Sequence, residues 1–296
     1  MNKIFSKAIG SLFFSLSVFS LFACDDSFDP VCDVDYTEFV TVTRNEVVTT
    51  RGGSSCLPVN TKLKPYAIGK YEVTYELYFS VRDWANDNGY NIVGEGRCGS
   101  EPEDGKLPEY YGTQKRCYPA SYIDWLDAVV WCNAYSEIDG REPVYYSDAA
   151  FTKVLRSSDK SVNSNPPCFK KTDAKGYRLP TSAEWEFAGR GANCNDTKTW
   201  SYIYAGSSAK EEMDDYAVWG KTSTEVVGSK KPNSIGLYDM SGNVWEMCEE
   251  KHARGGSYGV SFVSANSNPL FFSYKPFSPC YGYKDDYLGF RLVLSF

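Results

Sequence analysis

The chain has 296 residues, of which 38 are acidic and 31 are basic, so its formal net charge is −7 at pH 7. No cluster of Lys and Arg interrupts this acidic balance. Nucleic acid is therefore not an expected partner, because binding to phosphates needs a basic surface. His252 is the only histidine and no Cys-x-x-Cys motif occurs, which argues against structural zinc and against a histidine-based catalytic triad.

The amino-terminal residues have the pattern of an export signal. Lys3 and Lys7 precede an apolar stretch, 9–23, that is too short for an ordinary membrane span. Its end, Leu-Phe-Ala before Cys24, resembles the lipobox of bacterial lipoproteins, which implies cleavage before Cys24 and lipid attachment to its sulfur. A plain secretory signal that happens to carry a cysteine is the alternative. We expect residues 1–23 to be a lipoprotein signal peptide and the exported protein to be anchored through its lipid to a membrane of the bacterial envelope.

The rest of the chain is predicted to form one α+β domain after a short leader. Residues 24–60 are mainly polar, and we expect a tether or an edge hairpin there. Residues 61–296 contain no linker and are expected to be a single domain. Three helices are predicted in it, beginning after Thr74, Asp124 and Thr181, since these are good capping residues and the third is followed by Glu184 in a capping box. Residues 287–296 are predicted to be a closing strand.

The cysteine content predicts disulfides. Nine cysteines remain after Cys24, and an exported chain can oxidise them. Because nine is an odd number, at least one thiol stays free or pairs outside the chain. Cys98 and Cys117 bracket a polar insertion and are predicted to form a disulfide. A pair between Cys132 and Cys280 is a second, weaker expectation.

Six short sequence blocks stand in a fixed order between residues 61 and 296. They are Tyr71–Thr74, Trp125–Asn133, Gly176–Phe187, Asn233–Glu246, Arg254–Tyr258 and Gly289–Val293. Together these blocks resemble the signature of the formylglycine-generating enzyme (sulfatase-modifying factor) family. The resemblance implies an irregular variant of the C-type lectin fold, which agrees with the α+β prediction. Function is a separate question, because it depends on the site rather than on the fold.

The resemblance is weakest where the family carries its catalytic residues. In the family, two cysteines closely follow the Gly-Gly-Ser-aromatic block, bind copper(I) and oxidise a substrate cysteine with oxygen. Soft thiolates suit copper(I), but the corresponding positions here are Val260 and Ala265. Ser257 and Trp245, which match active-site positions of the family, are present. We therefore expect neither catalytic residues nor copper. An oxidase that uses another cysteine arrangement is the alternative.

The resemblance also implies one structural calcium site. Its ligands would be the carboxylates of Asp239 and Glu246 and the backbone carbonyls of Gly242 and Val244, an all-oxygen set that suits calcium. A second calcium site of the family is expected to be lost, because its asparagine aligns with Ala217. From the spacing alone, a buried turn with two solvated acids is the alternative.

Residues 259–287 are rich in Ser, Asn, Tyr, Phe and Gly, a composition typical of recognition loops. In the family fold this segment lines the groove that holds the active site. We expect the groove to bind a peptide, a glycan or a protein partner. The predicted contact residues are Phe271, Phe272, Tyr274, Tyr281 and Tyr283. Two alternatives remain: a packed aromatic loop without a ligand, and a purely structural envelope protein.

Overall fold

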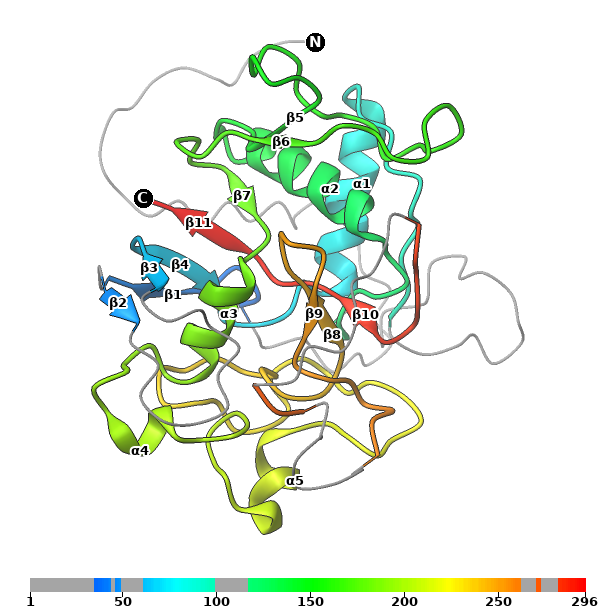
Figure 1. Ribbon diagram of the computed structural model, residues 1–296. Helices are drawn as coiled ribbons and strands as arrows, with labels where there is room; N and C mark the ends of the chain where they lie inside the picture. The colour runs from blue at the N-terminus through cyan, green and yellow to red at the C-terminus, as the bar shows by residue number, and fades with distance from the viewer. Residues whose placement is uncertain (1–34, 44–45, 49–60, 99–116, 262–269, 273–281) are drawn as a thin grey trace. The chain divides into compact units, whose positions relative to one another are not determined.

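The computed structural model describes residues 35–43, 46–48, 61–98, 117–261, 270–272 and 282–296. All of them belong to one compact unit, residues 32–296. Its largest sheet is antiparallel, with the strand order β1-β4-β11-β7. The strands are β1 (Phe39–Val42), β4 (Tyr66–Gly69), β7 (Tyr177–Arg178) and β11 (Val293–Ser295). The carboxyl-terminal strand β11 therefore lies inside the sheet, between β4 and β7 (Figure 1).

Three smaller sheets complete the strand structure among the described residues. In the first, β8 (Trp245–Met247) lies between β10 (Leu288–Gly289), which is parallel to it, and β9 (Ala253–Arg254), which is antiparallel. The other two are the pairs β2 (Glu46–Val48) with β3 (Thr61–Leu63), and β5 (Tyr145–Tyr146) with β6 (Phe169–Lys170). The β10–β8–β9 sheet brings the 239–246 loop next to the carboxyl-terminal segment.

Two long helices and several short ones accompany these sheets. The helices are α1 (Tyr75–Asp87), α2 (Trp125–Ile138), α3 (Ser182–Gly189), α4 (Thr197–Trp200), the 3-10 turn η2 (Lys210–Glu212) and α5 (Met213–Tyr216). Figure 1 shows α1 and α2 side by side, with β7 next to α2. The rings of Tyr78, Trp131 and Phe290 pack together between these elements, so the main core joins both helices to the carboxyl-terminal segment.

The predicted helix starts are confirmed. Thr74 caps α1 with its side chain, and capping boxes open α2 and α3. The predicted closing strand is only partly correct, because it is divided into β10 and β11 with Arg291 between them. The buried side chain of Arg291 points to Glu246 at this interruption. The leader expected in 24–60 contributes β1 to the edge of the main sheet, paired with β4.

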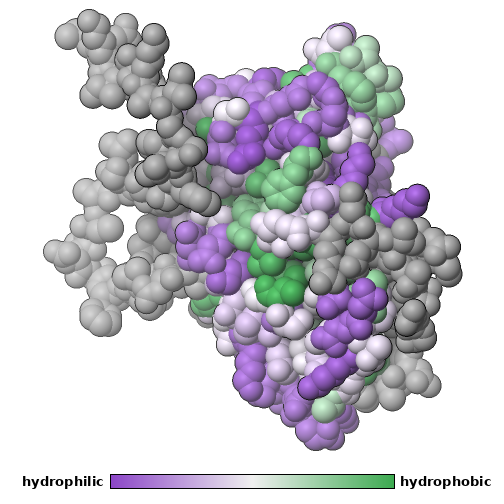
Figure 2. All heavy atoms as spheres, turned by 90° about the vertical axis from the view of Figure 1, so that its left-hand side faces the viewer, coloured by the Kyte–Doolittle hydropathy of each residue, from purple (hydrophilic) through white to green (hydrophobic). Residues whose placement is uncertain are grey.

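The surface has one feature that bears on binding. Figure 2 shows the left-hand face of Figure 1, where hydrophobic residues gather in the middle of the face between hydrophilic regions above and below. Exposed apolar patches on soluble proteins often mark sites of interaction. No helix among the described residues is long and apolar enough to cross a bilayer.

Candidate functional site

The loop that precedes β8 has an unusual backbone. Asp239 and Asn243 have φ angles of 57° and 60°, a left-handed conformation that few side chains adopt without support. Gly242, at φ 87°, is needed for space as well, since a Cβ there would lie 2.2 Å from the carbonyl oxygen of Val218. The loop is therefore held in one shape, which directs the side chains that follow it into the core.

Glu246, on β8, is the centre of a buried ionic network. Its carboxylate accepts hydrogen bonds from Arg291 Nε at 2.5 Å and from Arg291 Nη2 at 2.6 Å. The indole Nε1 of Trp185, on α3, donates to the same carboxylate at 2.7 Å. The side chains of Glu246 and Arg291 are both fully buried. This network joins β8, α3 and the carboxyl-terminal segment.

Two further carboxylates lie in the same region. Glu72 accepts hydrogen bonds from Asn243 Nδ2 at 2.7 Å and from Val244 N at 3.1 Å. Asp239 accepts one from Gly228 N at 2.7 Å through Oδ2, while its buried Oδ1 has no hydrogen-bond donor. Burial raises the pKa of Asp239 to about 6. Burial, reinforced by Asp239 and Glu246, also raises the pKa of Glu72 well above its usual range.

The four predicted calcium ligands can be tested against this geometry. Asp239 fits, because a buried carboxylate oxygen without a donor is suited to a cation. The two oxygens of Glu246 already accept three hydrogen bonds from Arg291 and Trp185, so this carboxylate has less capacity left for a metal. No group of three His, Cys, Asp or Glu side chains converges on one point in the described part of the chain. A calcium ion here would therefore depend on the carbonyls of Gly242 and Val244.

The residues that match the family's active site are buried or half-buried. Ser257 and Trp245 are only 3% and 6% exposed. Val260 is half-buried, packs against two apolar clusters, and donates its backbone N–H to the carbonyl of Ser257 at 3.1 Å. Ala265 lies outside the described residues. At residue 260, an apolar side chain therefore stands where the family has a copper-binding cysteine.

The thiols that the structure describes near this core have raised pKa values. Cys132 and Cys248 are fully buried, and burial raises the pKa of each well above its usual range. Burial also raises the pKa of Cys168 to about 12. Since the thiolate is the form that binds metals and attacks other groups, these side chains are held in their unreactive form.

The predicted disulfide between Cys98 and Cys117 is not the one in the structure. Cys117 is disulfide-bonded, but no cysteine among the described residues is its partner. Sequence spacing suggested this pair but could not establish the geometry that a disulfide needs. The second expected pair is also wrong, because Cys132 is a free thiol within α2.

The predicted aromatic contact surface needs correction. Phe272 is fully buried and packs edge-on against Trp185, with ring centroids 5.8 Å apart, and Phe271 is 7% exposed. Burial of a large aromatic ring removes much apolar surface from water, and both rings are buried in this way. Tyr283 is exposed at 37%, as expected of a contact residue. Tyr274 and Tyr281 lie outside the described residues.

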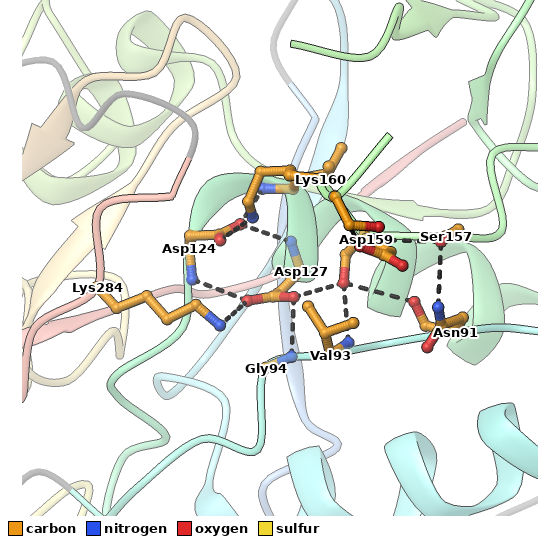
Figure 3. Close-up of polar contacts among 12 residues, drawn as sticks. Asn91, Val93, Gly94, Asp124, Asp127, Ser157, Asp159, Lys160 and Lys284 are labelled. Carbon is orange, nitrogen blue, oxygen red and sulfur yellow. Dashed lines mark hydrogen bonds and ion pairs between the residues drawn. The ribbon is translucent and has the colours of Figure 1, made fainter. Parts of the chain in front are cut away.

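A second ionic cluster, which the sequence did not predict, fixes the segment that begins at residue 282. Lys284 Nζ lies 2.8 Å from Asp127 Oδ2, and Lys160 pairs with Asp124 (Figure 3). Asp127 also accepts hydrogen bonds from Gly94 N at 3.0 Å and from Asp124 N at 3.2 Å. Both aspartates are fully buried in the first turn of α2, where negative charge is favourable. The cluster anchors the base of the recognition segment to the helix.

The comparisons with known proteins agree with this architecture. Residues 28–296 match the sulfatase-modifying factor enzyme 1-like domain. The chain belongs to this family. It is 31% identical over 238 residues to a protein of Paenibacillus barcinonensis named chaperone protein LppX, covering 72% of this chain and 74% of that protein. The solved structure of CarF has a TM-score of 0.69 and 30% identity, covering 88% of this chain and 98% of that one.

A shorter match points to an enzyme of the family. The formylglycine-generating enzyme of Thermomonospora curvata is 36% identical over 86 residues, which are 25% of this chain and 27% of that protein. The chain is thus similar in sequence both to a protein named a chaperone and, over a shorter stretch, to one named a formylglycine-generating enzyme. Family membership establishes the α+β fold of the formylglycine-generating enzyme type, and the activity has to be argued from the site.

Proposed function

We propose that this protein is a non-catalytic member of the family that works as a lipid-anchored binding protein in the bacterial envelope. The observation that carries the proposal is Val260, which is half-buried in apolar packing where the family has a copper-binding cysteine. An isopropyl group cannot ligate copper(I) or exchange a disulfide with a substrate. The raised pKa values of Cys132, Cys168 and Cys248 support the proposal, because copper(I) sites use thiolates.

We propose a polypeptide as the ligand class for the groove. A relative from Paenibacillus barcinonensis is named a chaperone, and the match covers most of both chains. The hydrophobic residues that gather in the face of Figure 2 give the protein a further surface that suits contact with the apolar side chains of another chain. The Ser-, Asn- and Tyr-rich composition of residues 259–287 adds adaptable hydrogen-bonding groups and aromatic contact area.

The polypeptide proposal is tested with the purified protein and an unfolded exported protein. Reduced, denatured polypeptide is diluted from denaturant, and its aggregation is followed by light scattering. We expect equimolar purified protein to suppress the aggregation and to be recovered in a complex with the polypeptide. An exported protein of similar size and charge is the control. Aggregation that proceeds equally with both would contradict the proposal and leave a structural envelope role as the better account.

The anchor is tested separately, because residue 24 lies outside the described residues. The apolar stretch that ends at Cys24 motivates the expectation of lipid attachment. Replacement Cys24→Ala should leave the protein unprocessed or release it from membranes. Metabolic labelling with a fatty acid, followed by membrane fractionation, measures both effects. A Cys24→Ala variant that still carries the acyl label would show that the lipid is not on this residue.

A further inference from the structure

A polar surface cavity of about 490 Å³ lies between α5 and the segment 228–232, and neither Ser257 nor Val260 lines it. This volume is typical of small-molecule sites, which range over ~300–1,000 Å³. The lining residues are Asp214, Asp215, Gly228, Ser229, Lys230 and Lys231, together with Pro232 and Tyr238. Neither the family's catalytic chemistry nor the proposed polypeptide groove uses this cavity.

The charges at the cavity cancel but are not all paired. Lys231 Nζ lies 2.8 Å from Asp215 Oδ2, so these two groups satisfy each other. Lys230 Nζ lies 3.8 Å from the nearest oxygen of Glu225, which is beyond hydrogen-bond distance. Among the described residues, Asp214 has no hydrogen-bond or ion-pair partner. The cavity therefore presents one available acceptor and one available donor, with two acids and two bases in total.

The aromatic wall of the cavity is the ring of Tyr238, which is stacked on the ring of Tyr71. The rings of Tyr71 and Tyr238 are 5.1 Å apart and inclined by 22°. Lys70 Nζ lies over both rings, 5.5 Å and 5.8 Å from their centroids. Gly228, at φ 75°, fits closely beneath them, because a Cβ there would lie 2.7 Å from Tyr71 Cε1. The aromatic wall is thus held in place before any ligand binds.

We propose that this cavity binds a neutral sugar residue of a glycan. A sugar hydroxyl both donates and accepts, so one ring can bond the Asp214 carboxylate and the Lys230 ammonium without bringing a charge of its own. The C–H groups of a sugar can pack on the tyrosine wall. Because the two acids and two bases of the cavity cancel, its net charge favours neither anions nor cations. None of the residues that line the cavity belongs to the segment 259–287, so the variants below test this inference separately from the polypeptide proposal.

The test is saturation-transfer NMR on the purified protein with the methyl glycosides of glucose, galactose, mannose and N-acetylglucosamine. We expect at least one glycoside to receive saturation and to give a measurable dissociation constant by titration. Asp214→Asn and Lys230→Gln should each weaken that affinity by about tenfold, since each removes a hydrogen bond to a charged group. Asp214 is exposed, so the first substitution leaves the fold intact.

Glu211→Gln is the matched control, because Glu211 is an exposed acid of the preceding 3-10 turn that does not line the cavity. Its affinity for the glycoside should equal that of the unaltered protein. Absence of saturation transfer to all four glycosides would overturn the proposal. Equal affinity in the control and in both cavity variants would overturn it as well. Binding of a free amino acid, together with no binding of any glycoside, would also overturn the proposal, because the ligand would then be a zwitterion and not a neutral sugar.

Discussion

Two of the buried ionic networks of this protein differ in their balance of charge. Beneath the 239–246 loop, the three carboxylates of Glu72, Asp239 and Glu246 share the single guanidinium of Arg291, and Asp239 Oδ1 has no donor. At the start of α2, Asp124 and Asp127 are matched by two lysines, and every carboxylate oxygen accepts a hydrogen bond. The α2 cluster is complete as folded, whereas the loop network has three acids to one base, an imbalance that a cation would offset.

The largest expected effect comes from removal of the only cation of the loop network. Arg291→Met leaves Glu246 buried without its partner, beside two other buried carboxylates. We expect a loss of about 3–5 kcal/mol in the free energy of unfolding, or failure to fold, as for other broken buried pairs. Urea denaturation measures the loss. The control is Arg141→Met, because the pair of Arg141 with Asp139 is about 40% exposed and should contribute less than about 1 kcal/mol. Equal losses in the two variants would contradict the importance given to the buried network.

Calcium is the next test, since it would correct the imbalance of the same network. After full chelation, addition of calcium should raise the melting temperature, and at 100 times the dissociation constant it should add about 2.7 kcal/mol to stability. Asp239→Asn should remove this response, because it removes the carboxylate oxygen that lacks a donor. Asp148→Asn is the control, since the carboxylate of Asp148 is exposed and accepts hydrogen bonds only from Thr152 and Lys153 in its own turn. Calorimetry that shows no calcium response in the unaltered protein would count against the site.

The balanced cluster should give the smallest effect. Lys284→Met removes one of four donors to Asp127, and Lys284 is 22% exposed, so we expect a loss of only about 1–2 kcal/mol. The loss should decrease at high salt, because the lysine lies partly in solvent. Lys171→Met, which breaks an exposed pair with Glu142, is the control for the loss of a surface charge. A loss in Lys284→Met as large as that in Arg291→Met would mean that charge balance does not distinguish the two networks.

The features that the sequence predicted well are local. Each of the three helix starts depends on a capping residue and the three or four residues that follow it, so the signal is contained in one short stretch. The fold was predictable because the six blocks stand in the family's order. The blocks also contained Glu72 and Arg291, but their roles could not be read from the sequence. Glu72 binds Asn243, which is 171 residues away, and only the folded chain brings them together.

Burial was the other property that the sequence could not supply. A Phe in a segment of recognition-loop composition can face a ligand or the core, and the residue type is the same in both cases. Phe272 belongs to the core because it packs against Trp185, and Phe271 because it joins the apolar cluster of Met213 and Ala217 around α5. Val260, by contrast, was informative from its identity alone, since no environment makes an isopropyl group a ligand for copper. The absence of a chemical group is easier to predict than the use of one.

The most direct test of the central claim, that the fold of the oxidase is kept without its chemistry, is an assay of the oxidation itself. Purified protein is incubated with copper(I), oxygen and a sulfatase-type peptide that contains a cysteine. An authentic formylglycine-generating enzyme serves as the positive control. Oxygen uptake and the mass of the peptide are both measured. We predict no copper-dependent oxygen uptake and no change in peptide mass. Conversion of the peptide cysteine to formylglycine above the level of the protein-free control would contradict the account.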